Sequence, residues 1–104
     1  MGQLIFSPQA VRELKSIYRF IKKDSHFNAL RVRDKIINQA EKLILNPTAG
    51  RIIIETSKLI IRQIMVYKYR VFYKQNGEDV EVISIFHSAR LLENNPDIQN
   101  WFDD

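Results

Sequence analysis

The chain has 104 residues, of which 45% are hydrophobic and none is cysteine, and its formal net charge is +4. This composition is typical of one folded domain, expected to span residues 1–104, and it excludes disulfides, thiolate chemistry and cysteine-ligated zinc. No apolar run approaches the ~20 residues of a membrane span, and the N-terminus lacks a signal-peptide pattern. We therefore expect a soluble, cytoplasmic protein without membrane contacts.

The first half of the chain is predicted to contain a short strand and two helices. Residues 3–6 are an apolar segment typical of a strand, and Ser7-Pro8 then supplies a helix cap and a proline at the first helical position. Apolar side chains recur at helical spacing over residues 10–21 and again over residues 27–44. Asn46-Pro47 ends the second helix, since a residue before proline avoids the helical conformation. The short joint between these segments predicts an antiparallel helical hairpin.

The second half is rich in β-branched and aromatic residues and is predicted to form four strands, at residues 51–55, 60–66, 69–74 and 80–87. Asn76-Gly77 predicts a hairpin turn because both residues tolerate a positive φ. The segment from Pro96 to Phe102 could form a short C-terminal helix. The order β-α-α-β-β-β-β predicts an α+β fold, in which an N-terminal strand and a helical hairpin pack on one face of a mainly antiparallel sheet.

Charge is distributed unevenly along the chain. From Arg51 to Lys74 there are six basic residues and a single acid, Glu55, whereas from Glu93 to the C-terminus there are four acids and no base. A basic middle region predicts a polyanionic or acidic partner, although an ordinary solvated surface would account for it equally well. The acidic, aromatic segment from Pro96 to Asp104 could also fold back over the basic strands.

The last two strands are predicted to bring polar side chains together. With a turn of two or four residues, residues of opposite parity share a face, so Arg70 lies on the same side as His87, and Arg90 follows just beyond the strand. Arginine can hold a phosphate through two hydrogen bonds, and histidine can transfer a proton near neutral pH. The three residues are therefore a candidate site for phosphate chemistry. They could instead solvate the strand end or pair with Glu55 or Glu81.

Tyrosines interleave with the basic residues at Tyr67, Tyr69 and Tyr73. Stacking of bases on tyrosines beside arginines is a common way to bind single-stranded nucleic acid. Tyr69 and Tyr73 are equally typical of a strand core, whereas Tyr67 lies in a tight turn and is more accessible to a ligand. The sequence contains no metal-ligand pattern, Gly-rich phosphate loop or nucleophile elbow, so no metal or cofactor is expected.

Several of these motifs occur in a recognisable order between Ser7 and about Leu92. They are the early helix, Asn-Pro-Thr-Ala-Gly-Arg at residues 46–51, Tyr-Arg-Val-Phe-Tyr at residues 69–73, and Phe-His-Ser-Ala-Arg at residues 86–90. The ordered set resembles the RelE/ParE superfamily of toxins from bacterial type II toxin–antitoxin systems. The resemblance implies a toxin encoded beside an antitoxin that wraps around it and silences it.

The resemblance leaves two kinds of target open. RelE-like members cleave mRNA on the ribosome with basic residues and often a tyrosine, whereas ParE-like members poison DNA gyrase. Arg70 and Arg90 occupy the positions of functional arginines in RelE-like ribonucleases. The lysines that those enzymes place on the preceding strand are replaced here by Ile61 and Gln63.

A related nuclease branch also matches only in part. There the last strand ends in His-Tyr and follows a functional Glu and Arg. This chain has Glu55, Arg70 and His87, but Ser88 replaces the tyrosine. The ending Phe-His-Ser-Ala-Arg and the Pro-x-x-Gly-Arg after the second helix are more similar to ParE-type toxins, so the resemblance favours that branch.

Three hypotheses follow from the sequence. The first is a ParE-like toxin that poisons DNA gyrase, without enzymatic activity of its own, and contacts its target through basic and aromatic residues. Those contact residues are Arg51, Arg62, Tyr67, Lys68, Arg70 and Arg90. The second is a RelE-like endoribonuclease acting on ribosome-bound mRNA, with four catalytic residues. Those residues are Arg70, His87, Arg90 and Glu55. The third is a non-toxic, basic nucleic-acid-binding module.

For either toxin, the resemblance implies a cognate antitoxin and a toxin–antitoxin hetero-oligomer. We expect the antitoxin to cover the basic strands of residues 51–74 with an amphipathic helix and acidic side chains, and it could add a strand to the sheet.

Overall fold

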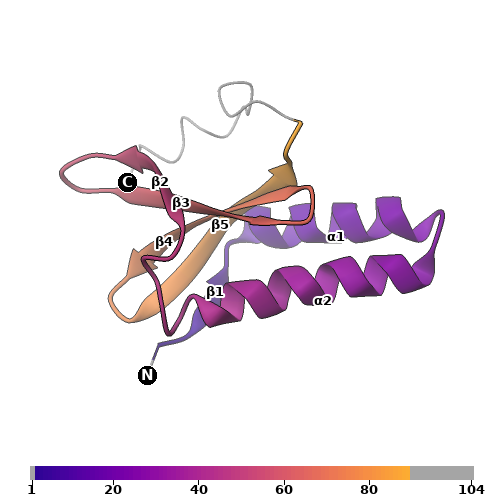
Figure 1. Cartoon of the computed structure of the whole chain (residues 1–104), viewed down its shortest axis with the longest axis horizontal. Coiled ribbons are helices and arrows are strands. Elements are labelled where there is room, and N and C mark those ends of the chain that lie inside the picture. Colours follow the sequence, from indigo (N-terminus) through magenta and orange to yellow (C-terminus); the bar gives the residue numbers. More distant parts are fainter. Residues whose placement is uncertain (1, 90–104) are drawn as a thin grey trace.

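The computed structural model describes residues 2–89 and shows two helices and five strands (Figure 1). The elements are β1 (Leu4–Phe6), α1 (Pro8–Lys22), α2 (His26–Lys42), β2 (Arg51–Glu55), β3 (Ile60–Val66), β4 (Tyr69–Asn76) and β5 (Asp79–His87). The strand order is β1-β5-β4-β3-β2, in which β1 is parallel to β5 and the other neighbours are antiparallel. The predicted α+β fold is confirmed. Arg90 and the segment from Pro96 to Asp104, with its expected helix and fold-back, lie outside the described residues.

A serine caps the N-terminus of each helix, as predicted for Ser7, and the two helices cover one face of the sheet. The Ser7 side chain accepts a hydrogen bond from the Ala10 amide, and the Ser25 side chain accepts one from the Asn28 amide. The main core lies between the helices and the sheet. Its buried residues are Ala10, Ile36, Ala40 and Leu43 from the helical half, and Val66, Val71, Tyr73, Val80, Val82 and Ile85 from the strands. In residues 2–89 neither helix is long and apolar enough to cross a membrane.

A second, smaller apolar cluster lies on the face of the sheet that points away from the helices. It is formed by Ile61, Phe72 and Phe86, whose side chains are at most 4% exposed. The rings of Phe72 and Phe86 stack with their centroids 4.9 Å apart. Both faces of the sheet therefore carry apolar side chains.

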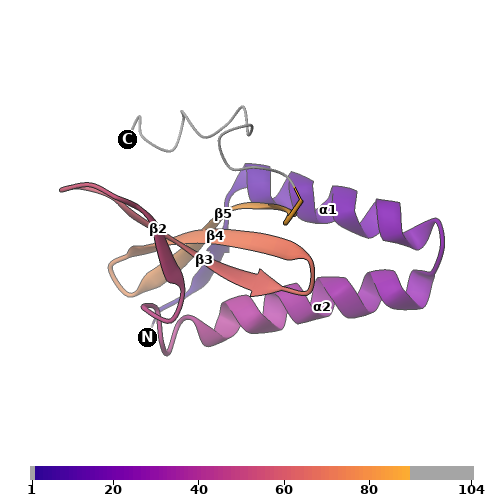
Figure 2. The ribbon, with the colours of Figure 1, turned by 45° about the horizontal axis from the view of Figure 1, so that its top comes forward.

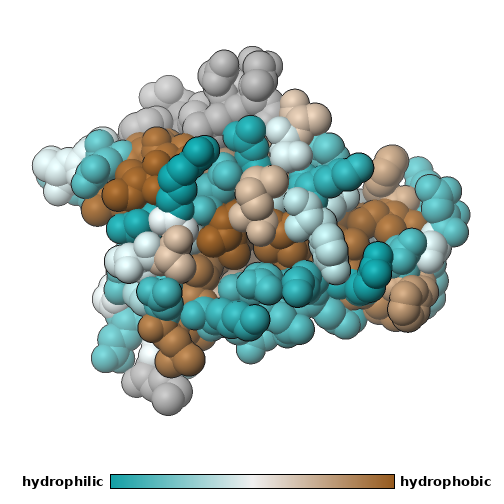
Figure 3. All heavy atoms as spheres, in the orientation of Figure 1, coloured by the Kyte–Doolittle hydropathy of each residue, from teal (hydrophilic) through white to brown (hydrophobic). Residues whose placement is uncertain are grey.

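The helical hairpin extends beyond the sheet. In Figures 1 and 2 the turn between α1 and α2 lies well past the strand ends. Two phenylalanines in this overhanging part, Phe20 on α1 and Phe27 on α2, are 69% and 72% exposed. Figure 3 shows hydrophobic surface between the helices near this end and hydrophilic residues along them. The sheet thus leaves part of the hairpin's apolar face uncovered.

The register between β4 and β5 changes partway along the pair. Next to the turn it follows the predicted parity, with Lys74 opposite Glu81. Farther along, β5 contains one extra residue, Ile83, which has no partner on β4 and forms a β-bulge. Because side chains alternate along a strand, this single extra residue exchanges the two faces of β5 relative to β4.

The bulge overturns the predicted pairing of Arg70 with His87. Beyond the bulge, Arg70 lies opposite Phe86, and His87 lies opposite Tyr69. Neighbouring residues of a strand point to opposite faces, so His87 lies on the helix-covered face and Arg70 on the other. The prediction that Arg70 and His87 share a face is therefore wrong, since it assumed an unbroken register.

The β3–β4 and β4–β5 turns each contain one residue with a positive φ. In the β4–β5 turn this residue is Gly77, with φ of 63°, whereas Asn76 pairs with Asp79 instead of sharing this conformation. In the β3–β4 turn it is Tyr67, with φ of 53°. A side chain at positive φ costs roughly 1–2 kcal/mol, a cost that glycine avoids. Tyr67 is therefore strained.

Candidate functional site

The segment between α2 and β2 is held in place by two side chains from the sheet. The Tyr73 hydroxyl donates a hydrogen bond to the Pro47 carbonyl and accepts one from the Gly50 amide, each 2.8 Å long. The Arg62 guanidinium donates to the carbonyls of Gly50 at 2.9 Å and Thr48 at 3.3 Å. We call this set of contacts the α2–β2 latch. It accounts structurally for the Pro-x-x-Gly-Arg motif, and it gives Arg62, expected to be a target contact, a structural role.

The latch predicts a loss of stability at alkaline pH. Burial raises the pKa of the Tyr73 hydroxyl above its ordinary value of 10.0, although the Gly50 hydrogen bond and the nearby Arg62 charge act in the opposite direction. Above about pH 10 the unfolded chain therefore releases this proton more readily than the folded chain, and folding weakens as pH rises.

Urea unfolding at pH about 9 and about 11 measures this effect. Wild-type protein is expected to lose more stability between the two pH values than Tyr73→Phe does. Burial raises the pKa of Tyr69 as well, so some dependence on pH remains in the variant. Equal losses for the two proteins would contradict this role of Tyr73.

A second group of predicted residues gathers where the β3–β4 turn meets the end of β5. The Ser88 amide donates a hydrogen bond of 2.7 Å to the Lys68 carbonyl, and the Arg70 guanidinium donates one of 3.3 Å to the Ser88 carbonyl. Tyr67 and Lys68 are exposed, and Arg70 is half-buried. We call Tyr67, Lys68, Arg70 and Ser88 the turn end of the sheet. Of the six predicted target contacts, three are brought together here.

His87 lies near this group but on the other face. Its Nδ1 accepts a hydrogen bond of 3.0 Å from the Ala89 amide, which places the proton of a neutral ring on Nε2. The ring meets Tyr69 edge to face, with centroids 5.6 Å apart and an interplanar angle of 82°. His87 is thus directed toward the side covered by α1.

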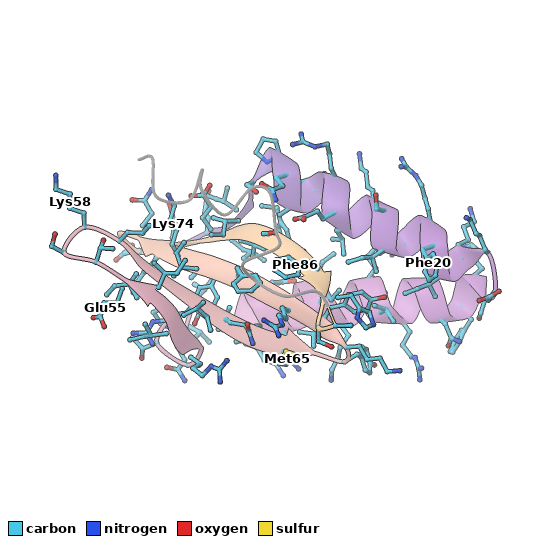
Figure 4. All side chains as sticks on the ribbon, turned by 90° about the horizontal axis from the view of Figure 1, so that it is seen from above. Phe20, Glu55, Lys58, Met65, Lys74 and Phe86 are labelled. Carbon is cyan, nitrogen blue, oxygen red and sulfur yellow. The ribbon has the colours of Figure 1, made fainter. Side chains whose placement is uncertain are left out.

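Glu55 lies far from both Arg70 and His87. It is the last residue of β2 and pairs with Ile60, whereas Arg70 pairs with Met65 at the other end of β3. Five residues of strand separate these positions, which corresponds to about 17 Å. Figure 4 shows Glu55 and Met65 well apart along the sheet. Glu55 therefore cannot act on the same group as Arg70.

On the face of the sheet that carries Arg70, the two β3 positions at which the resemblance implies lysines are uncharged. Ile61 is 1% exposed and Gln63 is 8% exposed, so the two positions expected to bear lysines in a ribonuclease are buried here. The Gln63 side-chain oxygen is also buried and accepts no hydrogen bond from any residue between 2 and 89. Arg51, which pairs with Gln63, is exposed at the outer edge of the sheet.

One surface was not singled out from the sequence. A groove of about 620 Å³ runs between α1 and the ends of β4 and β5, and its lining includes Phe20, Ile85 and His87. In it, Glu13 Oε1 accepts hydrogen bonds of 2.9 Å from the Ile85 amide and from the Ser84 hydroxyl. This carboxylate accepts the hydrogen bond of a backbone amide on the part of β5 that extends beyond β1, and so it has a structural role.

The exposed charged residues along the solvent side of α1, beside this groove, are all basic. We call this set the α1 basic stripe; its exposed members are Arg12, Lys15, Arg19, Lys22 and Lys23. The spacing of these residues places most of them on one side of the helix, and it is visible in the sequence. A basic stripe beside an apolar groove complements an amphipathic partner with acidic side chains.

Comparisons with known proteins agree with this architecture. In the solved structures, the chromosomal ParDE TA system from P. aeruginosa matches with a TM-score of 0.67 and 21% identity, covering 84% of this chain and 96% of that one. The isolated E. coli RelE toxin matches with a TM-score of 0.61 and 17% identity, covering 96% of this chain and 98% of that one. The archaeal RelE-RelB complex from Pyrococcus horikoshii OT3 matches with a TM-score of 0.51 and 20% identity, covering 86% of this chain and 98% of that one. At these identities the likeness establishes the fold.

The sequence itself also matches a family. No curated protein matches the chain significantly. Residues 4–92, however, match the family described as the ParE toxin of the type II toxin-antitoxin system parDE. Because this match spans most of the 104 residues, the chain belongs to the ParE toxin family of type II toxin–antitoxin systems.

Proposed function

We propose that this toxin acts by binding DNA gyrase and inhibiting it, without cleaving RNA, and that a cognate antitoxin neutralises it. The observation that supports the choice of target is the separation of the candidate nuclease groups. Arg70 and His87 lie on opposite faces of the sheet, and Glu55 lies at its far end.

RNA cleavage needs an acid or base within hydrogen-bonding distance of the ribose hydroxyl, together with cations at the phosphate. Arg70 lies opposite Met65, and the next β3 residue on that face, where a ribonuclease is expected to carry a lysine, is the buried Gln63. A half-buried arginine that binds the Ser88 carbonyl suits a structural or protein-contact role. This arrangement favours a toxin that works by occupying a site on its target.

The antitoxin, in this proposal, docks on the α1 basic stripe and its groove. The sequence pointed to residues 51–74 as the basic surface, but three cations of that region already have partners. Arg62 belongs to the latch, Arg70 donates to the Ser88 carbonyl, and Lys74 Nζ lies 3.8 Å from Glu81 Oε1. The α1 basic stripe has exposed cations along several turns, and the groove beside it is lined in part by apolar side chains such as Phe20 and Ile85. An acidic amphipathic helix would satisfy both.

The proposed target is tested with purified protein in two assays run side by side. We expect inhibition of DNA supercoiling by gyrase at micromolar protein, and no new mRNA ends in primer extension on ribosomes. His87→Gln, which keeps an acceptor for the Ala89 amide but cannot titrate, is expected to inhibit gyrase as wild type does. New mRNA ends that disappear in His87→Gln, with gyrase unaffected, would replace this proposal with the endoribonuclease.

A further inference from the structure

A second groove lies where the β3–β4 turn meets α2, on the side of the hairpin away from the α1 groove. Its volume is about 400 Å³, and Tyr67 from the turn lines it together with residues of α2. Those α2 residues are Phe27, Leu30, Arg31, Asp34, Lys35 and Asn38. Because the hairpin extends past the sheet, Phe27 has no strand packed over it and is 72% exposed. The groove thus has an aromatic side chain at each of two sides.

The side chain of Tyr67 lines this groove, and the backbone of the same residue has an unfavourable conformation. Its φ is 53°, a value at which glycine is unstrained and tyrosine is not. The ring is 50% exposed, so its own burial offsets little of that strain. The Arg31 guanidinium lies 5.9 Å from the ring centroid and helps to fix its position. An exposed aromatic ring kept in a strained turn indicates that the ring itself makes a contact.

The charge around the groove indicates what that contact is. Arg31 and Lys35 line it, and Lys68 follows Tyr67 in the turn. The acid in the lining, Asp34, forms an ion pair with Arg33, with 3.1 Å between Nη2 and Oδ1. The groove therefore presents two apolar rings within a net positive rim, which fits an apolar side chain flanked by a carboxylate. Because Asp34 also lies in the lining, the net positive charge of the rim is small, which suits a single carboxylate better than the many phosphates of a nucleic-acid backbone.

We propose that this groove binds the target protein, receiving an apolar side chain of gyrase while an adjacent acid meets Arg31, Lys35 or Lys68. This inference rests on the proposed function and adds where the toxin contacts gyrase. In this arrangement Tyr67 is a specificity-determining residue, and Phe27 contacts the same apolar side chain from across the groove. The antitoxin, in this arrangement, has its own groove along α1.

The experiment measures the protein concentration that half-inhibits supercoiling by gyrase. Tyr67→Gly removes the ring and the strain together, so its melting temperature is expected to equal or exceed that of wild type, while the half-inhibitory concentration rises at least about tenfold. Tyr67→Phe keeps the ring and is expected to stay within about threefold. Phe27→Ser is expected to lose inhibition as Tyr67→Gly does.

Leu45→Ser is the matched control, because Leu45 is an apolar side chain 85% exposed and remote from the groove. It is expected to inhibit as wild type does. The proposal is overturned when Tyr67→Gly and Phe27→Ser inhibit normally, or when they lose only neutralisation by the antitoxin. A wild-type protein that leaves gyrase active would instead remove the proposed target itself, and this inference with it.

Discussion

Gly50→Ala is expected to lower the free energy of unfolding by about 3 kcal/mol, a large share of the roughly 5–15 kcal/mol that holds a small domain together. A Cβ at this position would lie 2.5 Å from the Tyr73 hydroxyl oxygen and 2.9 Å from the Gln63 carbonyl oxygen. Either the Tyr73 ring or the segment before β2 must then move. Moving either one breaks the hydrogen bonds that form the α2–β2 latch.

Thermal unfolding followed by circular dichroism measures this loss, with two variants as references. Gly77→Ala probes a glycine at positive φ whose Cβ would meet nothing within 4 Å, and it is expected to cost only about 1–2 kcal/mol. Tyr73→Phe removes the hydroxyl, so adding Gly50→Ala to it is expected to cost less than Gly50→Ala alone. If Gly50→Ala costs as much stability in the Tyr73→Phe protein as in the wild type, the latch is not the reason why residue 50 must be glycine.

Much of the fold was predictable because local signals agree with the final structure. Ser7 and Ser25 cap the two helices that the apolar spacing indicates, and Asn46-Pro47 follows the second. The β-branched runs became the strands with shifts of one or two residues at their ends. These features depend on neighbouring residues alone, which is why a single sequence reveals them.

The faces of the last hairpin were not predictable in the same way. One unpaired residue, Ile83, reverses the side on which His87 lies relative to Arg70. A bulge leaves little trace in this sequence, because the strand Asp79–His87 has apolar residues both before and after the bulge. The roles of Arg62 and Tyr73 also depend on a connection more than ten residues away in sequence. Long-range contacts of this kind decide which polar residues remain available for function.

Reversing the charge of two arginines on the α1 basic stripe, Arg12→Glu with Arg19→Glu, is expected to reduce the rate of antitoxin association at least about tenfold at low salt. Both side chains are exposed, so the fold should be unaffected. Surface plasmon resonance at several salt concentrations measures the effect. The association rate of the wild type should fall as salt rises, because screening shortens the range of attraction to about 10 Å at 0.1 M, whereas that of the variant should depend on salt much less.

Arg51→Glu with Lys58→Glu is the matched control, since it changes the net charge by the same amount on the basic strand region that the sequence indicated. Both residues are exposed, and Lys58 lies in the β2–β3 turn, far along the sheet from α1 (Figure 4). A rate governed by total charge would fall equally for the two double variants. A rate governed by the α1 basic stripe falls mainly for the first, because steering depends on where cations face the incoming acid. A larger loss in the control would place the antitoxin on the strands instead.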